Sequence, residues 1–431
     1  MKNYYKKSIH STILFMLIGV NYLFAQTHLS TPNDLRGIES NVNGSYILDN
    51  SIDMTSESWN QFDFKGTLDG NGYSIKNLNI NHSGDRGGLF NNITDATVKN
   101  LGLENLTVNT PNAWAGGIAG NSSNGIITKC FITGTISSNG FAGGLVGHAF
   151  NSTITQCYSK ANVTGRDHVG GLVGHMNTGT INNCFVEAVI ISTAWQVGGL
   201  VGWATSPTCL ITNSFVKGTV KSQYGFTGAI LGIADGGDGA VIVSNCIAMQ
   251  DEIESTNPDI VKTYRVVANE NGLTAVMTNN YGFDFMTITD PYKTDLNLLG
   301  KDGDDISSAQ FKDAALYATN LPTWDFTNVW VMESTGPQLR WASGSLNTVT
   351  NIKQNNFSVY PNPAKDLMFI ASDESLISDI NITDLNGRIV MKNTFNKVSQ
   401  AQIDIAPLAT GLYIMNVKSD SGSFTKKIIK K

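Results

Sequence analysis

Short runs of alternating apolar and polar residues fill most of this chain, and glycine or asparagine interrupts them every few positions. Such runs predict short β-strands with one buried face, separated by tight turns. The phrase Gly-Gly-Leu-Val-Gly recurs at 143–147, 170–174 and 198–202, with looser copies that begin at Gly87, Gly116 and Gly228. Successive copies start 29, 27, 27, 28 and about 30 residues apart. This period predicts an all-β fold, a right-handed parallel β-helix with one repeat per coil.

One position of the repeat takes only small or apolar residues, namely Leu78, Leu101, Cys130, Cys157, Cys184, Ser214 and Cys246. A position that alternates among these residue types points inward and has little room, so we expect buried free thiols there. Disulfides are the alternative for an exported chain. No histidine shares the position, which argues against a metal site. Asparagine usually precedes it, at Asn77, Asn100, Asn183, Asn213 and Asn245, and this indicates amides that bond from coil to coil.

Both ends of the repeat region carry helix-start signals. Residues 30–38 place Ser and Thr before Pro and Asp, and a helix there would cover the first strand edge. Residues 302–312 contain a second start, with Asp305 or Ser307 as its cap. The aromatic residues that follow are expected to plug the open end of the helix; they include Trp324, Trp330 and Trp341.

The sequence divides into four expected parts. Residues 1–25 have the basic start and the apolar run, Thr12–Phe24, of a secretory signal peptide, with an uncleaved anchor as the alternative. The β-helix with its caps is expected over 26–343. A polar linker without apolar periodicity follows at 344–356, and short alternating strands over 357–431 predict a small β-sandwich.

Charge and composition narrow the class of partner. The formal net charge is −6, and only 15% of the residues are charged. Nucleic acid is therefore not expected as a partner, because the chain offers no basic stripe to replace phosphate counterions. No segment after the first 25 residues is long and apolar enough to predict a membrane helix. We expect an exported, soluble monomer.

The repeats resemble those of the GLUG-repeat proteins of bacteria. The resemblance rests on the Gly-Gly-Leu-Val-Gly copies, on the opening stretch Phe64–Leu78 and on the closing stretch Trp324–Trp341, and it covers about residues 30–342. It implies a parallel β-helix on an exported protein, such as an adhesin or a part of a surface protease or polysaccharide-utilisation system. The motif itself is structural and carries no catalytic residue to transfer.

The last 75 or so residues resemble a type A sorting domain of the type IX secretion system. The matching pieces are Phe357–Ala364, Ile382–Arg388, Leu408–Ile414 and the basic end Lys426–Lys431. The resemblance implies a Bacteroidetes source and the type IX machinery as a partner. It also implies passage across the outer membrane, followed by removal of the tail and either surface anchoring or release.

Candidate catalytic residues gather on adjacent coils. His148 and His175 both follow a Gly-Gly-Leu-Val-Gly copy directly, so they should lie about 4.8 Å apart, one strand spacing. His168 precedes a copy by two residues, and Arg166 stands beside it. With Tyr224, these residues would suit β-elimination on a uronate, which needs a cation for the carboxylate and a base for the C5 proton. The alternative is that they are polar decoration at a turn and a plain surface ion pair.

Candidate ligand-binding residues form a stripe beside these histidines. One repeat position reads Trp114, Phe141, His168, Gln196 and Phe226, while Trp195 lies next to it and Trp203 occupies the slot of His148 and His175. The following residue is small or apolar, so alternation should turn the stripe outward. An exposed aromatic row indicates an interaction surface, and flat rings suit sugar faces. A loop or the C-terminal aromatics covering the stripe is the alternative.

Two classes of function remain. The first is binding of extracellular polysaccharide in glycan utilisation or adhesion. The second is a lyase or dehydratase that acts on uronic-acid glycans; paired-carboxylate hydrolysis is less supported because acidic residues are sparse over 100–230. The repeats are tight and carry no long insertion to roof a cleft, which favours binding.

No cofactor is expected. The Asp-Gly runs at 235–239 and 302–305 would also suit calcium, although such runs are more often turns.

Overall fold

The computed structural model describes residues 26–81, 84–111, 114–236, 240–256, 263–268, 275–290, 301–343, 357–372, 376–384, 388–419 and 422–431. The predicted signal peptide, the predicted linker and residues 237–239 of the first Asp-Gly run lie outside these residues. Contacts divide the chain into two compact units, Met1–Leu339 and Arg340–Lys431.

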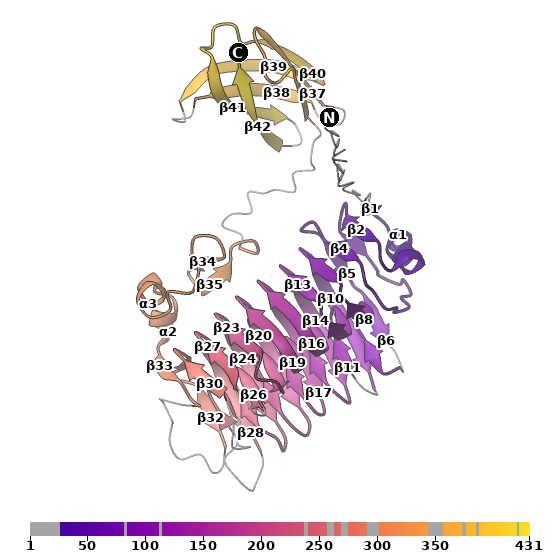
Figure 1. The fold of residues 1–431 in the computed structure, drawn as a ribbon, viewed down its shortest axis with the longest axis vertical. Coiled ribbons are helices and arrows are strands. Elements are labelled where there is room, and N and C mark those ends of the chain that lie inside the picture. The colour runs from indigo at the N-terminus through magenta and orange to yellow at the C-terminus, as the bar shows by residue number, and fades with distance from the viewer. Residues whose placement is uncertain are drawn as a thin grey trace, which may run out of the picture. The chain divides into compact units, whose positions relative to one another are not determined.

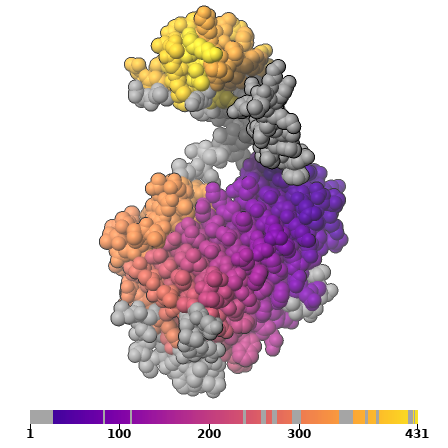
Figure 2. All heavy atoms as spheres, viewed as in Figure 1, coloured from indigo at the N-terminus to yellow at the C-terminus, as the bar shows by residue number. Residues whose placement is uncertain are grey.

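The first unit is a parallel β-helix, which confirms the fold class predicted from the repeat (Figure 1). Each strand pairs in parallel with the strand one coil away; for example, His148 lies opposite His175. Three sheets run along the helix, and Figure 2 shows their coils packed directly against one another on the face in view.

Sheet A comprises β1 (Thr27–Leu29), β2 (Ser45–Leu48), β4 (Thr67–Asp69), β8 (Phe90–Thr94), β9 (Thr97–Lys99), β12 (Ala119–Ser123), β13 (Ile126–Thr128), β16 (Val146–Thr155), β19 (Val173–Asn182), β22 (Val201–Ala204), β23 (Cys209–Thr212), β26 (Leu231–Ala234), β27 (Val241–Ser244) and β30 (Ala275–Thr278). Sheet B comprises β3 (Ile52–Asp53), β5 (Ser74–Lys76), β6 (Asn79–Asn81), β10 (Gly102–Thr110), β14 (Phe131–Ser138), β17 (Tyr158–Gly165), β20 (Phe185–Ser192), β24 (Phe215–Ser222), β28 (Ile247–Ser255), β31 (Tyr281–Phe283), β32 (Thr287–Thr289) and β33 (Asp304–Ile306). Sheet C comprises β7 (Arg86–Gly87), β11 (Trp114–Gly116), β15 (Ala142–Gly143), β18 (Val169–Gly170), β21 (Val197–Gly198), β25 (Thr227–Gly228) and β29 (Thr263–Tyr264).

The glycine motif turns the chain from sheet C into sheet A. Its leucine points into the core, where Leu145, Leu172 and Leu200 are fully buried. A Cβ on Gly147, the last glycine of one copy, would lie 2.8 Å from the backbone nitrogen of Ala115. Only glycine lets the backbone come so close, and this explains why the motif ends as it does.

The cysteine position is inward, as predicted. All five cysteines are free and buried. Four of them stack along the core, so that the Cys130 amide donates to Cys157 Sγ and the Cys157 amide donates to Cys184 Sγ, each at 3.4 Å. Burial raises the pKa of the Cys157 thiol well above its ordinary value, with the adjacent thiols of Cys130 and Cys184 adding to the effect.

The asparagines before that position have a conformational role. All five adopt the left-handed region, with φ between 50° and 57°, which asparagine tolerates better than most residues. Their amides do bond between coils, but mostly to a residue at a different repeat position and not to the asparagine one coil away. Asn100 donates to Asp69 Oδ1 and Asn213 donates to Asn182 Oδ1, both at 3.0 Å.

The first strands are capped as predicted. Helix α1 (Pro32–Gly37) begins after Thr31, whose hydroxyl accepts from the Asp34 amide while the Asp34 carboxylate accepts from the Thr31 amide. This reciprocal pair satisfies two backbone donors at the helix start. A 3-10 turn, η1 (Ile38–Asn41), follows, and Leu35 and Ile38 are fully buried.

The C-terminal part of the first unit, residues 301–339, is termed the strap here. It contains α2 (Ser308–Phe311), which Ser307 caps as predicted, α3 (Ala314–Thr319), β34 (Trp330–Glu333) and β35 (Gly336–Leu339). Its position beside the last coils is visible in Figure 1.

The expectation that Trp324 and Trp330 plug the open end is wrong. Their indole N–H groups donate to the Asn245 carbonyl at 2.9 Å and to Asn183 Oδ1 at 3.1 Å, so they lie against the side of the coils. The reason is a column of stacked rings on the outer face of sheet B, formed by Phe131, Tyr158, Phe185 and Phe215. Both indoles cover the Phe215 end of this apolar column.

The second unit consists of two antiparallel sheets. One contains β36 (Phe357–Tyr360), β37 (Leu367–Ser372) and β40 (Gln400–Asp404), and the other contains β38 (Ile377–Thr383), β39 (Ile389–Val398), β41 (Gly411–Ser419) and β42 (Gly422–Lys430). Its own core includes Ile370, Ile380 and Met415. The unit is a small β domain, as the alternating strands predicted.

Candidate functional site

The predicted histidine and aromatic residues meet outside the glycine motif, where sheet C turns into sheet A. Two columns of half-buried side chains point outward: one at or just before the start of a sheet C strand (Trp114, Phe141 and His168), the other directly after a glycine motif (His148, His175 and Trp203). Because the glycines bring the two strands together, these two columns of side chains lie against each other. We call the resulting cluster the aromatic corner; it consists of Trp114, Phe141, His148, His168, His175 and Trp203.

Rings in the aromatic corner contact one another from coil to coil. The His148 and His175 ring centroids are 4.8 Å apart, as the strand spacing predicted. His175 stacks on Trp203 at 4.6 Å, and His168 lies 4.4 Å from Trp203. Phe141 touches His168 at 4.7 Å. The three imidazoles therefore converge, but on aromatic faces.

Trp114 joins the aromatic corner through contacts with two of its rings. Its ring lies 4.8 Å from His148 and stacks on Phe141 at 5.7 Å. Sequence reasoning missed Arg86, whose guanidinium lies 5.0 Å from the centre of the Trp114 ring and donates to Asn92 Oδ1 at 2.5 Å. Arg86 pairs with Trp114 in register, so alignment of the looser copy at Gly87 would have found it.

Hydrogen bonding in the corner is incomplete. His148 Nδ1 lies 2.8 Å from Asn121 Oδ1, and His175 Nε2 lies 2.9 Å from Thr205 Oγ1. The Nδ1 atoms of His168 and His175 are buried without a hydrogen-bond partner. A buried nitrogen of this kind is more costly as an imidazolium, which must place two N–H donors.

The imidazole pKa values follow from this packing. Burial lowers the pKa of His168 to about 4, against the opposing effects of the Asp167 charge and the nearby Gln196 amide. Burial and the charges of His148 and His168 lower the pKa of His175 to about 3. Burial, with the charge of Arg86, also lowers the pKa of His148. All three rings are therefore neutral at neutral pH and weakly basic.

Three other predicted residues lie on the turns between sheets B and C. We call Arg166, Trp195 and Tyr224 the exposed edge. The Trp195 amide donates to the Arg166 carbonyl at 3.1 Å, and Ser222, two residues before Tyr224, donates to the Trp195 carbonyl at 2.8 Å. A backbone bond and a bond from the Ser222 hydroxyl thus link the three successive turns that carry these residues.

Side chains of the exposed edge face solvent. Trp195 and Tyr224 are each 55% exposed, and the Arg166 side chain is 59% exposed. Arg166 Nη1 lies 3.7 Å from Asp167 Oδ1, which is a loose ion pair. Gln196 and Phe226, which complete the predicted stripe, are half-buried. Arg166 and Tyr224 thus stand on the edge, while the histidines pack in the corner.

Carboxylates of the second Asp-Gly run contact an arginine. Asp302 Oδ1 accepts from the Arg265 amide at 2.9 Å, and Asp305 Oδ1 pairs with the buried Arg265 guanidinium at 2.7 Å. Within the described residues, no group of three or more His, Cys, Asp or Glu side chains is placed to hold a metal ion.

Two family models match this chain. The GLUG motif matches residues 138–164 and 193–221, and the secretion system C-terminal sorting domain matches residues 358–431. The sorting domain implies export to the cell surface or secretion through the type IX machinery. None of the helices in the described part of the chain has the length and apolar character that a membrane crossing needs.

Similar proteins are large or distantly related. Halomucin of Haloquadratum walsbyi (strain DSM 16790 / HBSQ001) is 34% identical over 130 residues, which is 25% of this chain and 1% of Halomucin. A putative immunoglobulin A1 protease from Bacteroides ovatus has a similar fold, with a TM-score of 0.52, 20% identity and coverage of 73% of this chain and 92% of that one. An IgA1 protease matches with a TM-score of 0.50 and 19% identity over 68% of this chain and 24% of that one. These two structural likenesses concern the fold alone.

Proposed function

Because the chain carries GLUG motifs on a parallel β-helix and a type IX sorting domain, we propose that it is an exported protein that binds extracellular polysaccharide through the exposed edge. The observation that carries the proposal is the placement of one guanidinium and two largely exposed rings on three successive turns. A chain of sugars laid along the β-helix would meet all three groups.

The chemistry of the edge favours acidic polysaccharides. The rings of Trp195 and Tyr224 offer apolar faces for the C–H faces of sugar rings. The Arg166 guanidinium has planar N–H donors that match a uronate carboxylate, and its ion pair with Asp167 is long enough to be replaced.

Binding is favoured over the alternative of β-elimination. An eliminating enzyme needs its cation and its base at one sugar unit, with a base pKa near the working pH. Here the pKa values of His168 and His175 are about 4 and 3, and their rings contact Phe141 and Trp203. A base that weak removes a carbon-bound proton poorly.

The test uses the full chain and immobilised alginate, homogalacturonan, ulvan and hyaluronan. Trp195→Ala combined with Tyr224→Ala should weaken retention about tenfold, as expected from the loss of two stacking rings. Phe150→Ala is the matched control, since Phe150 is 45% exposed but lies in β16 of sheet A.

The outcomes separate the two functions. Unchanged retention in the double variant, or an equal loss in Phe150→Ala, would remove the exposed edge as the binding surface. The same incubations are followed by absorbance for unsaturated uronate products. Product that depends on His148 and His175 would replace the binding proposal by the elimination alternative.

A further inference from the structure

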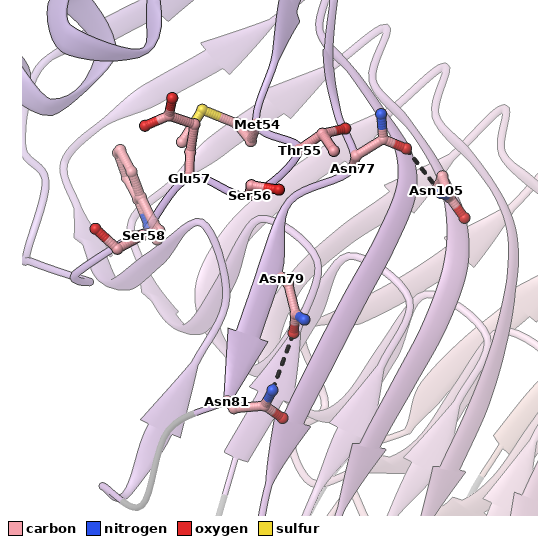
Figure 3. Close-up of a pocket in the computed structure, with 10 residues that line it drawn as sticks. Met54, Thr55, Ser56, Glu57, Ser58, Asn77, Asn79, Asn81 and Asn105 are labelled. Carbon is pink, nitrogen blue, oxygen red and sulfur yellow. Dashed lines mark hydrogen bonds between the residues drawn. The ribbon is translucent and has the colours of Figure 1, made fainter.

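A pocket of about 530 Å³ lies on the outer face of sheet B near the start of the β-helix (Figure 3). Its lining is Met54, Thr55, Ser56, Glu57, Ser58, Trp59, Asn77, Asn79, Asn81 and Asn105. We call it the amide pocket. Its volume falls within the range usual for sites that hold small ligands, about 300–1,000 Å³.

The amides reach the pocket from adjacent coils. Asn79 and Asn81 alternate with the buried Ile80 on β6, so both face outward. Asn105 adopts the left-handed region, with φ of 52°, at the point where the pairing of β10 with β14 shifts register. This irregularity lets the Asn105 side chain donate to Asn77 Oδ1 at 2.7 Å.

Part of the amide hydrogen-bonding capacity is used within the pocket. Asn81 donates to Asn79 Oδ1 at 3.1 Å, and Asn77 donates to Asp53 Oδ1 at 2.9 Å. These bonds fix the amide orientations, and they use neither the Asn79 amide nitrogen nor the Asn81 and Asn105 oxygens. Donors and acceptors set side by side match a hydroxyl group, which both donates and accepts.

Charged groups around the pocket are paired. Glu57 forms an ion pair with Arg36, and Lys76 Nζ lies 3.2 Å from Glu104 Oε2. Met54 and Trp59 belong to the lining but are only 1% and 8% exposed, and the Trp59 indole donates to the Leu89 carbonyl at 2.9 Å. The pocket therefore offers mainly neutral polar groups, and its lining contains no cation for an acidic ligand.

We infer that the amide pocket binds a neutral saccharide of one to a few sugar units. Three or four hydroxyls of such a ligand would pair with the amides. This site is separate from the exposed edge and differs from it in chemistry, because the edge carries a cation and the pocket carries amides. Neither inference depends on the other.

The experiment measures binding of maltotetraose, cellotetraose and mannotetraose to the full chain by calorimetry, with tetragalacturonate as the acidic arm. At least one neutral tetrasaccharide should bind, and Asn79→Ala combined with Asn81→Ala should weaken it about tenfold through lost hydrogen bonds. Asn109→Ala is the matched control, because Asn109 pairs with Asn81 in register one coil along and is not among the lining residues.

Three results would overturn the inference. One is that none of the neutral tetrasaccharides binds, and another is that the double variant binds like the wild type. The third is that Asn109→Ala weakens binding as much as the double variant does. Binding of tetragalacturonate that is lost in Trp195→Ala with Tyr224→Ala concerns the exposed edge, so failure of one site is distinguishable from failure of the other.

Discussion

Mild acid should destabilise the β-helix through the aromatic corner. The pKa of His175 is lowered to about 3 by burial and by the neighbouring imidazoles, whereas an unfolded histidine titrates near pH 6.5. Between these values the unfolded chain binds a proton at His175 that the folded chain does not bind. The contribution of His175 to stability is therefore fully present above about pH 6.5 and is lost as the pH falls toward 3.

The size of the effect follows from the difference in proton binding. A pH of 5 is about 1.5 units below the pKa of the unfolded imidazole. Protonation of the unfolded chain at this pH therefore lowers the free energy of unfolding by about 2 kcal/mol. The ring is only partly buried, so solvent screening reduces the expected effect to about 1–2 kcal/mol. His175→Phe removes the titrating group and keeps a planar ring beside Phe141 and Trp203. Between pH 7 and pH 5 the wild type should lose about 1–2 kcal/mol more than this variant.

Urea unfolding followed by tryptophan fluorescence measures the difference. Six of the seven tryptophans lie in the unit Met1–Leu339, so the signal reports the β-helix. Trp203→Phe is the control, because it changes a ring in the same stack without removing a titrating group, and it should keep the pH dependence of the wild type. Equal losses in the wild type and His175→Phe would refute the argument that this imidazole is held neutral by the corner.

Three further predictions concern the glycine motif, the strap and the buried cysteines. Gly147→Ala should lower the free energy of unfolding by about 2–4 kcal/mol, because the new Cβ would meet backbone atoms at 2.8 Å. Gly37→Ala is the control and should be near neutral, because nothing lies within 4 Å of its Cβ position. Thermal unfolding compares the two variants. Lys217→Met removes the hydrogen bond from Nζ to the Thr335 carbonyl at 2.9 Å. Hydrogen exchange of the strap amides should therefore become faster, by an amount equivalent to about 1–2 kcal/mol. Lys160→Met removes only an exposed ion pair with Glu187 and should leave this exchange unchanged. All five buried thiols should resist alkylation in the native chain and react after unfolding without a reductant; mass spectrometry of a bridged pair would contradict this.

Much of the fold could be predicted because a solenoid converts sequence period into spatial register. The cysteine column and the pair His148 and His175 were predictable for this reason, since each residue lies one repeat from its neighbour. The strap was not, because Trp330 and Asn183 are 147 residues apart and share no repeat. Only the ring column on sheet B, once seen, explains where the indoles dock.

The candidate site was predictable in position but not in chemistry. The sequence places three histidines on adjacent coils, yet it does not tell that Trp203 and Phe141 cover their faces and lower their pKa values. Arg86 escaped notice because it precedes one of the looser copies of the motif. The amide pocket depends on the loop 54–59, which lies outside the repeat, so no period predicts it.

The geometry of a coil explains why packed rings and exposed rings occupy different places on this molecule. Where the glycine motif turns the chain, backbones approach so closely that the outward side chains of two strands must pack on each other. Rings there gain contacts with one another but are shielded from solvent. The imidazoles among them therefore become weaker bases, as the lowered pKa values of His168 and His175 show. Where sheet B turns into sheet C, the turn residues Trp195 and Tyr224 are each 55% exposed. The polymer binding that we propose uses this second kind of surface.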